Sequence, residues 1–359
     1  MKDKSFTLWH FILFMKAILI IHLATFFINL NCVAQKHDYI WVLGHNGGTT
    51  INFNGNAPDI EFADRSAVME LQNASISDSL GNLLFYTNGC DIYNKNDEVM
   101  LNGNEINPGN LHNDQCEDLL GAYRGGGHGA FILPLPNNEN LYYLFHQGGV
   151  FVTQPTLDAY VDKQYFSIID MSQNNGLGNV LAKNQLILAD TFHAGDVTSV
   201  KHDNNLFWWI IFTKRTSNKY FKVLFTNNGI ESLTSQAIGN STLLFGDGGG
   251  QALFSPDGTK YVRYNYADGI IILDFDRATG EFSNYQHIDN GDTSMVAGGA
   301  AISPNSRYLY ISSQVKFYQY DLQAPDIAAS QVLLGEYDGF VSPFATTFYN
   351  CQLAPDCKI

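Results

Sequence analysis

Histidine and carboxylate side chains gather in one short stretch of the sequence, TFHAGDVTSVKHDN, which contains His193, Asp196 and His202. Imidazole and carboxylate groups bind divalent metals, so this stretch is a candidate metal or small-ligand site. His193 and Asp196 are three residues apart, however, and in a continuous strand they would point to opposite faces. A metal site also needs three or four converging ligands. We therefore favour a polar turn with a buried, hydrogen-bonded histidine and keep the three residues as candidates.

Two further motifs resemble known sites but depart from them. The glycine-rich stretch RGGGHGAF, residues 124–131, lacks the helix that follows a phosphate-binding loop, because Phe131 begins an apolar strand. The stretch DFDRATGE from Asp274 has alternating aspartates, but Ala278 stands where a third calcium ligand belongs. The sequence contains no Gly-x-Ser-x-Gly motif, and no Cys–His pairing is legible in it. We expect no catalytic residue and no cofactor.

Short strands must position these residues. Aromatic residues make up 13% of the chain, glycine occurs 32 times, and apolar runs alternate with Gly, Asn, Asp and Pro. Six segments share an apolar strand, a tight turn and an aromatic-rich strand. They start at Ala74, Ala130, Thr198, Gln251, Gly299 and Asn350, and their turns contain Asn82, Asn140, Asn205, Gly258, Ser306 and Cys357.

A further hairpin and a third strand follow each of the first five aromatic strands, which suits a four-stranded unit. One such unit cannot bury both of its faces, so neighbouring units must pack face to face around an axis. The sequence predicts an all-β β-propeller domain over residues 35–359, with four-stranded antiparallel blades. Five blades and the start of a sixth are visible, which predicts a truncated, incompletely closed ring. The adjacent Trp208 and Trp209 fit a strand that is buried on both faces.

The first 34 residues have the layout of a secretory signal peptide. Lys2 and Lys4 precede a long apolar stretch, and Cys32-Val33-Ala34 supplies small residues before Gln35, which predicts cleavage between Ala34 and Gln35. The apolar run from Ala17 to Leu30 is too short for a transmembrane anchor. Either Met1 or Met15 could be the true start, and the mature chain is expected outside the cell or at its surface, with no membrane span.

Charge and cysteine content narrow the classes of partner. The formal net charge of −15 excludes nucleic acid and anionic membrane as favoured partners, because both require a basic surface. Four cysteines follow the signal segment and form two near pairs. Export permits disulfides, while buried free thiols remain an equal alternative. These cysteines are Cys90, Cys116, Cys351 and Cys357.

The ordered succession of ASISDSLGNLLFYTNG, ALFSPDGTKYVRYN, GGAAISPNSRYLYISS and NCQLAPDCKI resembles secreted β-propeller regions of Bacteroidetes proteins with WD40-like repeats. Such proteins commonly carry a C-terminal sorting domain for type IX secretion. The resemblance covers roughly residues 39–359 and implies a fold and a location rather than an activity. Cys357 stands where that family usually has glycine, and the further blade strands that usually follow are missing from this sequence.

Two functions compete at this stage. We expect a non-enzymatic propeller that acts as a binding or scaffolding module for a protein or carbohydrate ligand, because no convergent catalytic set is visible. Rigid scaffolds place recognition on loops, and the longest loops follow the first blade. The alternative is a lactonase-like propeller hydrolase with a metal in its channel. An enzyme is the less favoured of the two.

Overall fold

The computed structural model describes residues 36–44, 48–119, 121–123, 127–153, 158–242, 249–291, 297–342, 345 and 347–359. The chain divides into two units, Met1–Gln35 and Lys36–Ile359. The predicted signal peptide and its cleavage site therefore lie outside the described residues. Within the described ranges, no helix is both long and apolar enough to cross a membrane.

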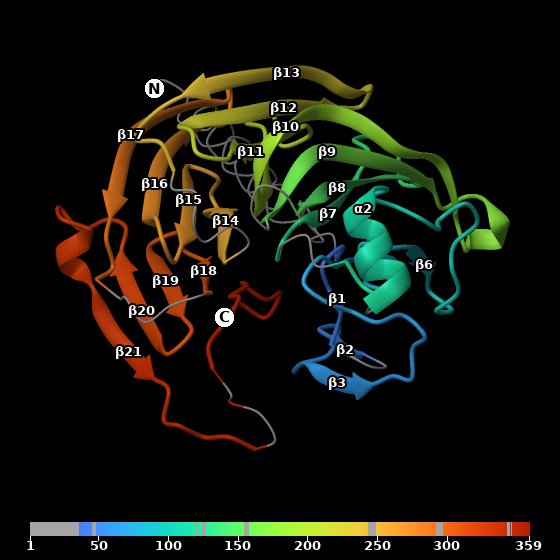
Figure 1. Ribbon diagram of the computed structural model, residues 1–359, viewed down its shortest axis with the longest axis horizontal. Helices are drawn as coiled ribbons and strands as arrows, with labels where there is room; N and C mark the ends of the chain where they lie inside the picture. Colours follow the sequence, from blue (N-terminus) through green and yellow to red (C-terminus); the bar gives the residue numbers. More distant parts are fainter. Residues whose placement is uncertain are drawn as a thin grey trace, which may run out of the picture. The chain divides into compact units, whose positions relative to one another are not determined.

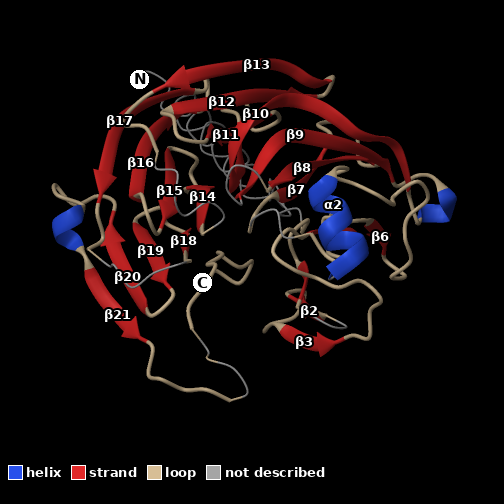
Figure 2. Ribbon diagram, viewed as in Figure 1, coloured by secondary structure: helices blue, strands red, loops and turns tan. Residues whose placement is uncertain are grey.

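The unit Lys36–Ile359 consists almost entirely of antiparallel sheets (Figures 1 and 2). An N-terminal sheet contains β1 (Ile40–Leu43), β2 (Thr49–Asn52) and β3 (Asp59–Phe62), and blade 1 contains β4 (Ala74–Ser77), β5 (Leu83–Thr87) and β6 (Ile92–Asn94). Blade 4 contains β14 (Gly250–Phe254), β15 (Lys260–Asn265), β16 (Gly269–Asp276) and β17 (Glu281–Ile288). Blade 5 contains β18 (Gly299–Ile302), β19 (Tyr308–Ser313), β20 (Lys316–Asp321) and β21 (Val332–Glu336).

Blades 2 and 3 share one long strand, β10 (Asn179–Lys201). Blade 2 consists of β7 (Ala130–Pro134), β8 (Leu141–Val152), β9 (Asp158–Asp170) and the first part of β10. Blade 3 consists of the last part of β10 with β11 (Trp208–Lys214), β12 (Lys219–Thr226) and β13 (Gly229–Ala237). The register of β10 shifts between Phe192 and Val197, where the strand passes from one blade to the next.

Among the described residues, helical structure is confined to short connections. They are α2 (Asn110–His112), a π-helical turn at Asn113–Leu119, and 3₁₀ turns at Asn174–Gly176 and Ala328–Ser330.

The hairpin turns show why the repeat recurs. In blade 4 the Ser255 hydroxyl donates to Asp257 and accepts from the backbone N–H of Lys260. In blade 5 the Ser303 hydroxyl donates to Asn305 and accepts from the N–H of Tyr308 in the same way. The corner residues Gly258, Ser306 and Cys357 all have positive φ, at 74°, 58° and 65°. Residues 354–358 therefore fold as the same turn, at the start of a sixth unit.

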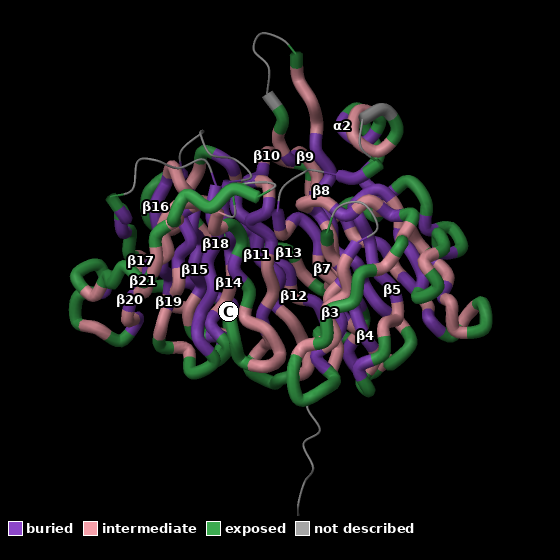
Figure 3. The backbone as a smooth tube through the Cα atoms, turned by 90° about the horizontal axis from the view of Figure 1, so that it is seen from below, coloured by how far each residue is buried: buried purple, intermediate pink, exposed green. Residues whose placement is uncertain are grey.

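Neighbouring blades bury the faces that they turn toward each other. Along β8, Tyr142 and Leu144 lie in a cluster with blade 1, whereas Tyr143 and Phe145 lie in a cluster with blade 3. Successive side chains of a strand point to opposite faces, so this strand is covered on both sides. Further clusters join blades 3 and 4 and blades 4 and 5. Figure 3 shows the strands largely buried and the connecting loops exposed.

The predicted all-β propeller is thus confirmed, because the consecutive blades stack face to face. Two details differ from the sequence-based expectation. Blade 1 has three described strands rather than four. The N-terminal sheet was not predicted, and it packs on blade 1 through Ile40, Val42 and Tyr86. Trp209 is buried between blades 3 and 4, and Trp208 packs against the cluster between blades 2 and 3, as expected for a strand with two covered faces.

Candidate active site in the channel between the inner strands

Glycines let the segments nearest the axis approach one another closely. Gly195, at φ 79°, leaves no room for a side chain beside the carbonyl oxygen of Gly127. A Cβ on Gly299 would lie 2.6 Å from the Cα of Asn350. The glycine-rich stretches before the inner strands therefore serve packing, and they bring distant backbone segments together.

A pocket of about 270 Å³ lies where these inner strands converge. Its walls come from β7, β10, β14, β18 and the C-terminal segment, so it lies between the inner strands of blades 2 to 5. The polar groups on its walls belong to His128, Thr198, Ser199, Gln251, Cys351 and Gln352, and the rest of the lining is apolar, as at Phe131, Leu253 and Ile302.

His128 supplies an imidazole to this pocket. Its backbone φ is 58°, in the left-handed region that non-glycine residues seldom occupy. Burial lowers the pKa of His128 to about 4, so the ring is neutral near pH 7 and is a weaker base than an exposed imidazole. Sequence reasoning missed this residue, since the glycine-rich stretch around it was interpreted only as a loop that leads into blade 2.

Gln251 fixes the wall that the C-terminal segment contributes. Its side-chain amide donates to the carbonyl of Cys351 at 2.8 Å, and its oxygen accepts from the N–H of Ala300 at 3.1 Å. Ser312 also donates to the carbonyl of Tyr349. The Cys351 side chain is buried, and this burial raises the pKa of its thiol. The thiol is therefore a poor candidate for an activated nucleophile, which needs a lowered pKa.

The structure does not assemble His193, Asp196 and His202 into a metal site. His193 is buried and shares a hydrogen bond of 2.7 Å between its Nε2 and the Thr242 hydroxyl. Asp196 is buried against Arg263, and His202 stacks on Trp209 at the far end of β10. His193 and Asp196 lie within the register shift of β10 between Phe192 and Val197, and both are buried.

Asp196, Arg263 and Asp268 form a buried ion triad at the boundary of blades 3 and 4. Arg263 donates through Nε to Asp196 and through a terminal nitrogen to Asp268 at 2.6 Å. The side chain of Arg263 is fully buried. Burial by itself would lower the pKa of Arg263, but the two carboxylates outweigh it and raise that pKa above its usual value.

Donor groups for a divalent metal do not converge in the described part of the chain. No group of three or more His, Cys, Asp or Glu side chains there could hold a metal ion. The pocket itself offers one imidazole and one thiol among its lining residues. These residues do not fit a channel metal of the kind that the hydrolase alternative included, because such a site needs at least three protein ligands.

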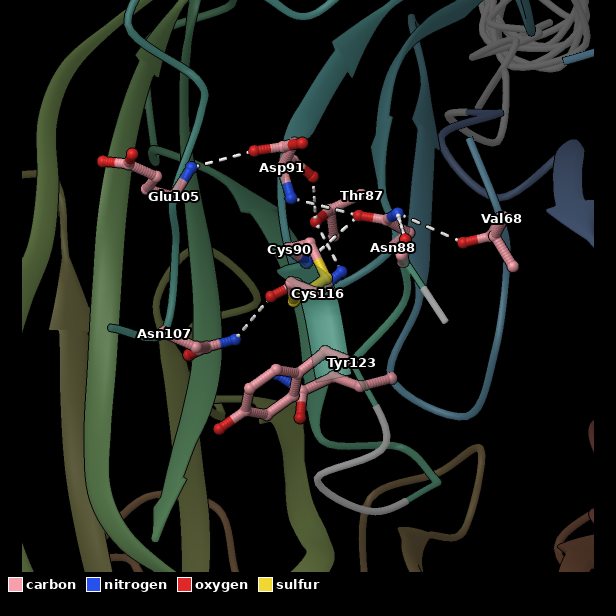
Figure 4. The surroundings of a disulfide bond; sticks show 12 residues. Val68, Thr87, Asn88, Cys90, Asp91, Glu105, Asn107, Cys116 and Tyr123 are labelled. Atoms are coloured by element: carbon pink, nitrogen blue, oxygen red, sulfur yellow. Dashed lines mark hydrogen bonds between the residues drawn. A yellow bond between two sulfur atoms is a disulfide. The ribbon is translucent and has the colours of Figure 1, made fainter. Parts of the chain in front are cut away.

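A disulfide between Cys90 and Cys116 ties the helical segment that precedes the His128 loop to blade 1, with Cα atoms 5.7 Å apart (Figure 4). Around it, Asn88 donates to the carbonyls of Val68 and Gly121, and the buried Tyr123 hydroxyl accepts from the N–H of Gly149 at 2.7 Å. The other near pair is not joined: Cys351 is a buried free thiol and Cys357 an exposed one.

Comparison with known proteins found no family for the chain and a set of distantly similar structures. No protein-family model matches the chain, and no curated protein matches it. Among solved structures, a candidate 6-phosphogluconolactonase from Bacteroides uniformis has 12% identity and a TM-score of 0.43, over 83% of this chain and 82% of that one. The Dos1 propeller has 10% identity and a TM-score of 0.43, over 82% of this chain and 66% of that one. The dihydro-heme d1 dehydrogenase NirN has 11% identity and a TM-score of 0.37, over 83% and 64%.

These neighbours correct one expectation from the sequence. Proteins named as enzymes, the candidate 6-phosphogluconolactonase and NirN, stand among the similar structures, so the prediction of a non-enzymatic binding module is contradicted. At such low identities and TM-scores, no substrate and no residue role can be transferred from these proteins to this chain.

Proposed function

We propose that the protein is a propeller hydrolase that cleaves a small ester or lactone in the channel pocket, with His128 as its general base. The observation that carries the proposal is a neutral imidazole on the wall of a pocket built by the inner strands of four blades. Convergent polar groups in a mostly apolar pocket are typical of a small-molecule site. The proposed reaction does not use the channel metal that the lactonase-like alternative included.

The reaction requires one proton carrier. A water oxygen attacks the carbonyl carbon while His128 accepts a proton from that water, and the same proton passes to the leaving oxygen as the carbon–oxygen bond breaks. The products are a carboxylic acid and an alcohol, or a hydroxy acid from a lactone. Thr198 and Ser199 line the pocket on β10, and since neighbouring side chains of a strand point to opposite faces, one of the two hydroxyl groups can donate to the developing oxyanion.

The pH dependence of hydrolysis tests the assignment. Because the imidazole is the base, kcat/KM should be constant from about pH 5.5 to 8 and fall as the pH drops through about 4, where His128 becomes protonated. We would measure it with neutral aryl esters and δ-lactones, and verify the folded state at each pH by circular dichroism. Absence of turnover on every ester and lactone, or an acid limb near pH 6.5, would refute the role of His128.

We also propose that the protein is exported with removal of residues 1–34, and that it resembles Bacteroidetes proteins that use type IX secretion. The signal-like layout and the disulfide between Cys90 and Cys116 support export, because disulfides persist in oxidising compartments. Secreted protein should begin at Gln35. It should show two thiols in denaturant without reductant, those of Cys351 and Cys357, and four with reductant. An intact N-terminus on extracellular protein, or four thiols without reductant, would contradict this.

A further inference from the structure

We infer that the channel pocket selects an uncharged substrate over an anionic one, an inference that rests on the proposed hydrolase function. The pocket walls combine apolar side chains with uncharged hydrogen-bonding groups. Among the described lining residues there is no Lys, Arg, Asp or Glu. A phosphate or carboxylate that left water for such walls would lose its hydration without gaining a cation, which is costly, whereas a neutral ester or lactone would not.

Buried charges adjacent to the pocket wall also disfavour an anionic ligand. Asp196 directly precedes Val197, a residue of the pocket wall, and Arg263 pairs across the ladder with Ala252, another wall residue. Asp196 and Asp268 both pair with Arg263, so the ion pairs described beside this wall contain more carboxylates than guanidinium groups. Carboxylates next to the pocket raise the free energy of an anionic ligand.

The long-range electrostatic field of the protein also disfavours anionic ligands. The chain has a formal net charge of −15 at pH 7, which lowers the local concentration of anions and slows their association. Salt screens that long-range part but hardly affects the buried triad. A preference that persists at high ionic strength would therefore originate in the pocket and the triad rather than in the surface.

The polar groups of the pocket wall indicate which functional groups the substrate carries. Thr198 and Ser199 lie on β10, and Gln352 lies on the opposite C-terminal segment. Hydroxyl and amide groups match the hydroxyl and carbonyl oxygens of a neutral polar molecule. The volume of about 270 Å³ is slightly below the range of drug-sized sites, so the substrate is small. The substrate class is a neutral, hydroxyl-bearing ester or lactone.

Matched substrate pairs test this inference. We would compare kcat/KM for glucono-δ-lactone with that for its 6-phosphate, and for a neutral aryl ester with that for the same ester carrying a carboxylate, at low and high salt. We expect the neutral member of each pair to be favoured at least tenfold, with most of the preference kept at high salt. Equal rates, or faster turnover of the anionic members, would overturn the inference and leave the hydrolase proposal intact.

A lack of turnover on all four compounds would instead refute the proposed hydrolase function. Ligand binding would then test the preference for uncharged molecules separately. Neutral and carboxylated δ-lactams, which cannot be hydrolysed readily, would be titrated while thermal unfolding is followed, because a ligand of the native state raises Tm. Stabilisation by the neutral lactam alone supports the inference. Stabilisation by the anionic lactam, or by neither, overturns it.

A substitution that adds a positive charge to the pocket wall tests the preference for uncharged substrates independently. Thr198→Lys adds a cation to the pocket, and Thr198→Met adds similar bulk without charge. The lysine variant should raise the anionic-to-neutral ratio of kcat/KM about tenfold or more relative to the methionine variant, since charge-assisted hydrogen bonds are stronger than neutral ones. The same ratio in both variants would show that the wall charge does not control selection.

Discussion

Replacing His128 by glycine is expected to lower kcat/KM for ester or lactone hydrolysis roughly 10²- to 10⁴-fold, the usual contribution of a general base. Stability should stay within about 1 kcal/mol of the wild type, because glycine tolerates the left-handed φ of 58° that strains other residues, while its greater freedom in the unfolded chain offsets part of that gain. Steady-state kinetics and denaturant titration measure the two effects.

His128→Asn is the matched control for this experiment. Asparagine tolerates positive φ and keeps a hydrogen-bonding side chain, but it cannot accept the proton of the attacking water at neutral pH. We expect it to be as inactive as the glycine variant and to lose the acid limb of the pH profile. Retention of wild-type kcat/KM by His128→Asn would mean that the imidazole is there for packing and that the base is another group.

Replacing Arg263 by methionine is expected to cost about 3–5 kcal/mol of unfolding free energy, enough to unfold a marginal domain. The substitution leaves the buried carboxylates of Asp196 and Asp268 without their shared cation. A buried charge without a partner is far more costly than a buried pair, and the side chain of Arg263 is fully buried. Urea or guanidinium titration measures the loss.

Two variants make this test specific. Arg307→Met removes an arginine that also pairs with an aspartate, Asp321, but at an exposed site, and its effect should be far smaller. The triple variant Arg263→Met, Asp196→Asn, Asp268→Asn removes both stranded charges and should recover much of the lost stability. If the single and triple variants are equally unstable, the loss arises from packing around Arg263 and the electrostatic account is wrong.

The repeat of strand, turn and aromatic strand was sufficient to predict the propeller. The turn chemistry of Ser255 and Ser303 is local, because both hydroxyl groups bond to residues within five positions, whereas Ser306 accepts a bond from the N–H of Asp257 in the other turn. Covered faces on both sides of β8 also follow from its continuous apolar run. The N-terminal sheet escaped notice because its strands have four residues each, include polar Thr and Asn, and lie outside the repeat.

Cysteine spacing was informative for one pair only. Cys90 and Cys116 are 26 positions apart in sequence, yet their Cα atoms are 5.7 Å apart because blade 1 and the helical segment after it fold back together. Cys351 and Cys357 are closer in sequence, yet one side chain is buried at the channel and the other is exposed beyond the turn. Sequence distance does not report the direction of a side chain.

The sequence by itself determined the fold class, because hydrophobic alternation and tight-turn residues act between neighbours along the chain. Only the tertiary structure decided the site. His128 belongs to a pocket because four inner strands and the C-terminal segment converge on it, and Asp196 meets Arg263 across 67 residues. Such encounters depend on how separate blades pack around an axis, and the free energy of that packing depends on contacts between blades that local sequence does not encode.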